Sequence, residues 1–246
     1  MRFFVRIAYR GTHFSGWQSQ QSDVTTIQET IEKALHTISG STLPIIGCGR
    51  TDSGVHAKKF YFHFDSELEW TDRIYSLNSL CGYDIAIQNI FKVDEGAHAR
   101  FDATRRDYNY LLHTYKDPFL RGLSYYFKEE FDLDRCNEAA ELLLEYSDFT
   151  TFCKTNTDVT HKKCELFISE WKEVEPGKYI YHISANRFLR GMVRLIVGMC
   201  LNIGKGRLSL EEVRSALNQK LTLDRAWSVP AHGLYLTDVQ YPYLND

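Results

Sequence analysis

The chain has 246 residues, of which 43% are hydrophobic and 25% are charged, and its formal net charge at pH 7 is −3. This composition is that of an ordinary globular protein with one large domain or two smaller ones. The near-neutral charge excludes an overall basic chain of the kind that nucleic acid or anionic lipid attracts, so any such partner must be bound by a local patch.

The cysteines and the N-terminal residues indicate the compartment. Six cysteines stand at positions 48, 81, 136, 153, 164 and 200, and no two form a C-x-x-C pair. A chain of this size buries its own core without disulfides, so we expect reduced thiols. The opening MRFFVRIAYR mixes charged with apolar residues, unlike a signal peptide. No apolar run reaches the roughly 18 residues of a membrane span. The sequence therefore predicts a soluble cytoplasmic protein.

The first half of the chain predicts several strands and two helices. Apolar residues at every second position from Phe3 to Tyr9 indicate a half-buried strand. Thr26 and Glu29 form a capping-box pattern before a helix, whose expected apolar face is Ile27, Ile31, Ala34, Leu35 and Ile38. Further strands are expected at 43–48, around 60–64 and at 85–93, with a short helix whose apolar positions are Ile74, Leu77 and Leu80.

The second half of the chain predicts a similar order of elements. A strand is expected at 108–115, followed by a helix capped by Asp132 with Cys136, Ala139, Ala140, Leu143 and Leu144 on its apolar face. Strands at 166–174 and 179–185 flank Pro176 and Gly177, a turn pair. Residues 188–203 predict a helix, Ser209 and Glu212 cap another, and 234–241 predict the last strand.

These elements predict an α+β protein. Strands recur in neighbouring pairs among the helices, without the strict alternation that a parallel sheet requires, so we expect two similar α/β subdomains with mainly antiparallel sheets. We place the first subdomain at 1–105 and the second at 106–246. The two halves share an order of elements but no detectable sequence repeat.

The stretch GRTDSGVHA at residues 49–57 concentrates reactive and turn-forming side chains. Asp52 precedes Gly54, and glycine permits the positive φ of a tight turn, so a solvated turn aspartate is one interpretation. An aspartic-protease loop is a second interpretation. That chemistry needs two carboxylates that share a proton, and the chain has no second D-[ST]-G. From these residues alone, a turn aspartate and a catalytic aspartate both remain open.

The longer string G-R-T-D-x-G-V-H-A resembles the signature of the tRNA pseudouridine synthase A family. Other stretches resemble motifs of the same family and follow in the family's order: YRGTHFSGWQ at 9–18, HARFDA at 98–103, RDYNY at 106–110, DFTTF at 148–152, ANRFLRGMVR at 185–194, IVG at 196–198 and GLYL at 233–236. The resemblance therefore covers essentially the whole chain.

This resemblance implies a fold and an activity. The fold would be the pseudouridine synthase fold, in which two subdomains form a central extended sheet flanked by helices, with a cleft between them. The activity would be isomerisation of uridine to pseudouridine in the anticodon stem-loop of tRNA, at positions 38, 39 and 40. The family works as a homodimer, and it uses no metal and no organic cofactor.

The resemblance also implies roles for single residues. Asp52 would be the catalytic nucleophile or base, Tyr108 the active-site tyrosine that stacks on the flipped base, and Arg194 the arginine that pairs with the aspartate. Arg50 would fill the space that the flipped base leaves, and Leu234 would line the pocket. The sequence does not choose between attack on the ring, attack on the ribose and proton abstraction.

Local charge adds candidates for RNA binding. Residues 185–207 carry five basic residues and no acidic one, which are Arg187, Arg190, Arg194, Lys205 and Arg207. Lys58 and Arg106 are basic positions beside the motifs. The substrate-binding candidates are therefore Arg50, Lys58, Arg106, Arg187, Arg190 and Leu234. Residues 129–145 hold seven acidic residues against Arg135, so an acidic helix turned away from a basic cleft would reconcile the net charge with RNA binding.

Departures from the family pattern leave rival functions open. Arg10 stands where the family usually has Asp, Ser53 replaces a frequent Ala, and the stretch 155–164 differs in sequence. The alternatives are an inactive tRNA-binding module on the same fold and an isomerase for another RNA. Cys48 follows an apolar run, which favours packing over nucleophilic attack, and His161 with Cys164 is a lone ligand pair that does not predict zinc. We expect His56 to hold the loop rather than to transfer protons.

Overall fold

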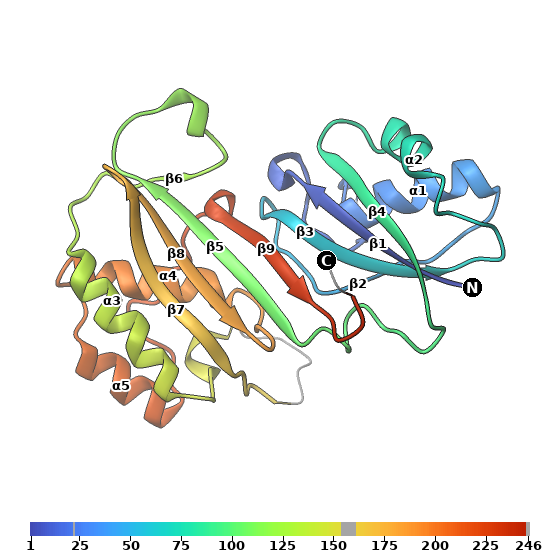
Figure 1. Ribbon diagram of the computed structural model, residues 1–246. Coiled ribbons are helices and arrows are strands. Elements are labelled where there is room, and N and C mark those ends of the chain that lie inside the picture. The colour runs from blue at the N-terminus through green and yellow to red at the C-terminus, as the bar shows by residue number, and fades with distance from the viewer. Residues whose placement is uncertain (22, 154–160, 245–246) are drawn as a thin grey trace. The chain divides into compact units, whose positions relative to one another are not determined.

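The computed structural model of the protein describes residues 1–21, 23–153 and 161–244 (Figure 1). The chain divides into two compact units, which we call unit 1, Met1–Thr104 with Tyr235–Asp246, and unit 2, Arg105–Leu234. Each unit combines a mainly antiparallel sheet with helices, so the expected α+β class is confirmed. Among the described residues, no helix has the length and apolar character that crossing a membrane requires.

The sheet of unit 1 is built around β3 (His56–Asp65). Its strands lie in the order β4 (Ile85–Val93), β1 (Arg2–Tyr9), β3 and β9 (Leu234–Gln240), and the short β2 (Ile46–Gly47) also pairs with β3. The β1, β2 and β4 pairings are antiparallel, whereas β9 runs parallel to β3. The last strand of the chain therefore completes the N-terminal unit, which a division in chain order at residue 105 does not anticipate.

Two helices of unit 1 pack against each other, α1 (Ile27–Ser39) and α2 (Ile74–Cys81). Thr26 caps α1 as its sequence pattern predicts, because its side chain accepts a hydrogen bond from the Glu29 backbone N–H. The core beneath is aromatic, with the following side chains buried: Phe3, Phe4, Trp17, Phe60, Phe62, Phe64 and Trp70.

Unit 2 has the strand order β5 (Arg105–His113), β8 (Lys178–Ala185) and β7 (Leu166–Glu175), with antiparallel pairing throughout. The short β6 (Tyr125–Tyr126) runs parallel to β5. The described residues of this unit form the helices α3 (Leu133–Leu142), α4 (Met192–Gly204) and α5 (Leu210–Gln219). Of these, α3 contacts both α4 and β7, and α4 supplies much of the buried core.

Two expected elements are shorter in the structure than the sequence suggested. The helix expected at 188–203 begins only at Met192, because Gly191 lies in the left-handed region with φ 73° and so cannot continue a right-handed helix. The strand expected at 43–48 is reduced to β2. Leu144 is 45% exposed, because α3 ends in a tighter 3₁₀ turn that rotates this side chain off the apolar face.

The buried His63 is expected to make stability depend on pH. Its Nδ1 accepts a hydrogen bond from the Ala99 backbone N–H at 3.1 Å, and the side chain is 1% exposed. Burial, with smaller contributions from Arg2 and His98, lowers the pKa of His63 to about 4. A histidine in an unfolded chain has a pKa of about 6.5, so the neutral form is favoured in the folded protein.

The contribution of His63 is therefore complete above about pH 6.5 and is lost as the pH falls from there toward 4, at a cost of up to about 3 kcal/mol. Thermal unfolding between pH 7 and pH 4 would test this in the wild type and in His63→Gln, which keeps a side-chain acceptor. We expect the wild type to lose more of its free energy of unfolding than the variant does. Parallel pH profiles would contradict the assignment.

Candidate active site

Residues 49–55 lead directly into β3, and 52–55 form a tight turn that we call the Asp52 turn. The Asp52 carbonyl accepts a hydrogen bond from the Val55 backbone N–H at 3.2 Å. Gly54 stands between them with φ 80°, a value that glycine adopts without steric cost. The turn leaves Asp52 half-buried at the edge of unit 1. The turn that the sequence indicated is therefore present, and it holds the candidate carboxylate on a fixed backbone.

The N-terminal motif at residues 9–18 braces this turn. The Tyr9 hydroxyl and Thr51 Oγ1 are hydrogen bonded at 2.8 Å in a buried contact. The Trp17 backbone N–H donates to the Thr51 carbonyl at 3.2 Å, and the Gly54 N–H donates to the Phe14 carbonyl at 3.3 Å. Two motifs that lie far apart in the sequence thus form one structure.

Glycines allow the two segments to approach this closely. A Cβ atom on Gly16 would lie 2.5 Å from the Thr51 carbonyl oxygen, and a Cβ on Gly11 would lie 2.0 Å from the Val55 carbonyl oxygen. A Cβ atom does not approach a non-bonded heavy atom this closely, so a larger residue at either position would push the Asp52 turn away. Gly11 and Gly16 of the N-terminal motif are therefore required for the close packing of the two segments.

His56 anchors the far side of the turn. Its Nδ1 accepts a hydrogen bond from the Gly11 backbone N–H at 3.1 Å, its ring stacks on Tyr235 at 4.5 Å, and it is 1% exposed. These contacts fit the expected role of holding the loop. Two of the substrate-binding candidates, Arg50 and Lys58, lie on either side of the turn with exposed side chains. Asp52 is therefore flanked in the sequence by two cations with exposed side chains.

Unit 2 brings the motifs at 106–110 and 185–194 together. Antiparallel pairing of β5 with β8 sets Arg106 opposite Ala185, and Arg106 Nη1 donates to the Asn186 carbonyl at 2.8 Å. The half-buried Tyr108 meets the ring of Phe188 edge-on at 5.1 Å. The candidate tyrosine and the loop before α4 therefore share one surface of unit 2.

Arg194 lies in the first turn of α4 and is half-buried. Its Nε donates to the Val229 carbonyl at 2.7 Å. Burial lowers the pKa of His232, and the positive charge of the Arg194 guanidinium lowers it further. Leu234, the last residue of unit 2, is 6% exposed.

The other cations of 185–207 divide into two groups. Lys205 and Arg207 both bind Glu129, at 2.8 and 2.6 Å, so part of the acidic stretch neutralises part of the basic one. Arg190 is exposed, and Arg187 Nη1 lies 3.3 Å from His161 Nε2. The arginines thus remain candidates for RNA contact. Of the atypical stretch 155–164, residues 155–160 lie outside the described residues.

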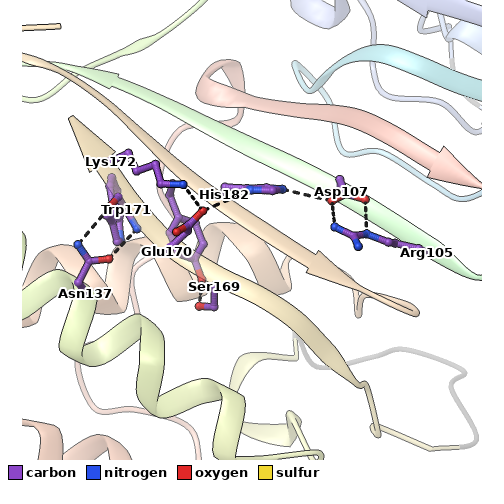
Figure 2. A network of polar contacts seen from close by, with 9 residues as sticks. Arg105, Asp107, Asn137, Ser169, Glu170, Trp171, Lys172 and His182 are labelled. Carbon is purple, nitrogen blue, oxygen red and sulfur yellow. Dashed lines mark hydrogen bonds and ion pairs between the residues drawn. The ribbon is translucent and has the colours of Figure 1, made fainter. Parts of the chain in front are cut away.

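A second polar cluster lies on the neighbouring strands, and the sequence did not indicate it (Figure 2). Asp107 is 6% exposed, takes two hydrogen bonds from Arg105 at 2.8 and 2.9 Å, and lies 3.2 Å from His182 Nε2. Glu170 and Lys172 on β7 form an ion pair at 2.6 Å and extend the cluster past His182. Burial opposes ionisation of Asp107, but the hydrogen bonds from Arg105 and His182 outweigh it, so the pKa of Asp107 is lowered.

This cluster supports the site rather than adding to it. Successive residues of a strand point to opposite faces, so Asp107 lies on the other face of β5 from Tyr108. Its two cations and two carboxylates balance in charge, and the buried carboxylate is already surrounded by donors. We therefore interpret it as a cross-strand ladder that fixes β5, β7 and β8 behind Tyr108.

The remaining reactive groups of the described residues are potential metal ligands and thiols. Among the residues that the structure describes, no group of three or more His, Cys, Asp or Glu side chains is arranged to hold a metal ion. All six cysteines are free thiols, and Cys48 is 1% exposed. Burial raises the pKa of the Cys200 thiol to about 12, which makes it a poor nucleophile.

Comparison with known proteins gives one consistent family. The sequence model of a family described as tRNA pseudouridine synthase matches residues 6–102 and 139–242, which include Asp52, Arg194 and Leu234 but not Arg106 or Tyr108. A tRNA pseudouridine synthase A of Bacteroides fragilis is 42% identical over 244 residues, covering 98% of this chain and 96% of its own. The enzyme of the same name from Bacillus subtilis is 38% identical over 250 residues, covering 98% and 99%.

Proposed function

The chain belongs to the tRNA pseudouridine synthase family, and on that premise we propose that it isomerises uridine to pseudouridine in the anticodon stem-loop of tRNA, at positions 38, 39 and 40. The observation that carries the proposal is the Asp52 turn. A half-buried carboxylate sits on a backbone that Gly54, Gly16 and the Tyr9–Thr51 bond hold in place, and the exposed Arg50 and Lys58 flank it in the sequence. A carboxylate on a fixed backbone, in a stretch that also offers exposed cations, suits chemistry on a polyanion.

The reaction needs no added atoms. The bond between N1 of uracil and the ribose carbon breaks, the ring turns, and C5 bonds to the same carbon while its proton is released and N1 regains one. Asp52 supplies either the nucleophile that holds the ring or ribose, or the base that removes a proton from the ribose after the uracil has departed. Both roles require an ionised carboxylate, and Arg194 is the proposed cation that favours ionisation once the RNA covers the site.

The target base must leave its stack before it can react. Extrusion costs a few kcal/mol, and contacts in the pocket offset it. We assign stacking on the flipped base to Tyr108, whose face would contribute about 1–3 kcal/mol. Arg50 takes the space that the base vacates, and Leu234 lines the pocket. Phosphate contacts fall to Lys58, Arg106, Arg187 and Arg190, which are all basic and at least partly exposed.

Tritium release from C5 of uridine would test this function directly. Anticodon stem-loop transcripts labelled at a single position, 38, 39 or 40, would be compared with transcripts labelled elsewhere in the same tRNA. We expect release only from the three stem-loop positions. Tight binding without release from any tRNA would favour an RNA-binding module, and release from another RNA alone would favour an isomerase with a different substrate.

We also propose that the protein acts in the cytoplasm as a homodimer. The homodimer follows from the resemblance to the tRNA pseudouridine synthase A family, and the cytoplasmic location from the composition and cysteine usage of the sequence. Light scattering coupled to size-exclusion chromatography would test the assembly. A mass of twice the chain's 28.7 kDa is expected, and a monomer at micromolar concentration would rule out a stable dimer.

A further inference from the structure

Residues 225–229 form an irregular extended segment that runs along α4, and we call it the 225–229 segment. It contacts the helix at three places. The Arg225 carbonyl accepts a hydrogen bond from Asn202 Nδ2 at 3.1 Å, and the Val229 carbonyl accepts one from Arg194 Nε at 2.7 Å. Between these two contacts, a Cβ atom on Gly198 would lie only 1.9 Å from the Trp227 carbonyl oxygen.

The spacing of these contacts shows why the segment can follow the helix. Positions 194, 198 and 202 are four residues apart, so they lie on one face of α4 with a rise of about 6 Å between neighbours. Two residues of extended chain also span about 6.6 Å. Alternate residues of the segment therefore meet successive turns of the helix, in antiparallel direction. Gly198 is the central contact, where the backbone of the segment lies directly on the helix.

Further contacts hold the middle of the segment and the residue that follows it. The Lys205 ammonium lies 5.5 Å from the centre of the Trp227 ring, which also packs against Phe127 at 6.2 Å. Just past the segment, the Pro230 carbonyl accepts a hydrogen bond from the fully buried Tyr110 hydroxyl at 2.9 Å. The Val229 carbonyl is therefore a fixed point, and the Arg194 side chain is tied to it.

We propose that Gly198 and Asn202 are positioning residues for Arg194, acting through the 225–229 segment. An arginine side chain is long and flexible, and a hydrogen bond at Nε fixes the plane of its guanidinium group. The segment thus orients the Arg194 guanidinium before the substrate binds. Because Gly198 lets the segment approach α4 closely, it determines the distance of the Val229 carbonyl from the helix. This inference rests on the proposed catalytic role of Arg194.

A double-mutant cycle tests the proposal. We expect Gly198→Ala to lower kcat for tritium release by about tenfold to a hundredfold, the usual cost of a misplacement near 1 Å, and to leave KM for tRNA within about twofold. In an Arg194→Ala background, Gly198→Ala should lower kcat further by less than about twofold, because the side chain that it positions is absent. Asn202→Ala should show a smaller loss of kcat with the same coupling, and it carries the cycle if Gly198→Ala does not fold.

Gly204→Ala is the matched control. Gly204 lies on the same helix and is also crowded, but its Cβ would meet Cys136 Sγ at 2.6 Å and the Asp132 carbonyl oxygen at 2.9 Å instead of the segment. We expect this variant to lower Tm and to keep kcat at a temperature well below Tm. An equal loss of kcat from Gly198→Ala in both backgrounds would overturn the positioning role. Wild-type turnover in Arg194→Ala would overturn the proposed catalytic role of Arg194 on which this inference rests, whereas the absence of release from the wild type would overturn the proposed function itself.

Discussion

Replacing Asp52 with alanine is expected to lower kcat for pseudouridine formation on the order of 10⁴-fold or more, while the Kd for tRNA stays within a few fold. The carboxylate is the only group in the Asp52 turn for which we propose covalent or proton-transfer chemistry, so no neighbour can replace it. RNA affinity should persist because Arg50 and Lys58 remain exposed beside the turn. Tritium release under single-turnover conditions, together with filter binding, would separate the two effects.

Two companion variants sharpen this test. Asp52→Asn keeps the size of the side chain but removes its charge, and it should be as inactive as Asp52→Ala. Ser53→Ala alters the next residue, whose hydroxyl donates to the Phe14 carbonyl at 3.2 Å, without touching the carboxylate. It should retain turnover within a few fold. Isomerisation by Asp52→Ala at a substantial rate would return Asp52 to the role of a turn residue.

The second large effect is expected from Arg194→Lys, which should reduce kcat by about 10²–10³-fold although the charge is kept. Lysine has no Nε–H to donate to the Val229 carbonyl, so the bond at 2.7 Å would be lost. It also lacks the planar fork that pairs with a carboxylate through two hydrogen bonds. The measurement is the pH profile of kcat for wild type and variant.

The control for this substitution is Arg214→Lys. Arg214 is an arginine of α5 that pairs with Glu145 at the surface, at 2.8 Å, and it has no role in the proposed site. Its replacement should leave kcat and KM unchanged within experimental error, because exposed ion pairs contribute little. Near-normal kcat for Arg194→Lys at every pH would rule out the proposed pairing with Asp52.

Much of the secondary structure could be predicted because its signals are local. The strand expected at 85–93 is present as β4 with the same limits, and the Ser209–Glu212 pattern marked a capping box in which both reciprocal bonds are present. The start of α4 could not be located in this way, because the apolar pattern runs through Gly191, whose backbone conformation depends on the surrounding loop.

The site was only partly predictable for a related reason. The motif resemblance pointed to Asp52 and Arg194, and both lie in the residues that the family model matches. The supports of these residues are tertiary contacts without a sequence period. The Tyr9–Thr51 bond joins residues 42 positions apart, and His182 meets Asp107 across 75 positions. The 225–229 segment has neither helical nor strand periodicity, so its residues did not predict its contact with Gly198.

The return of β9 to unit 1 has a consequence for biosynthesis. A ribosome adds about 5–20 residues per second from the N-terminus, and domains generally fold as they emerge. Here residues 105–234 of unit 2 are all translated before Tyr235 and Leu236, which pair with His56 and Ala57 at the start of β3. The strand that follows the Asp52 turn therefore gains its parallel neighbour only near the end of translation. A nascent chain can therefore complete unit 2 first. The strand pairing that supports the Asp52 turn forms last.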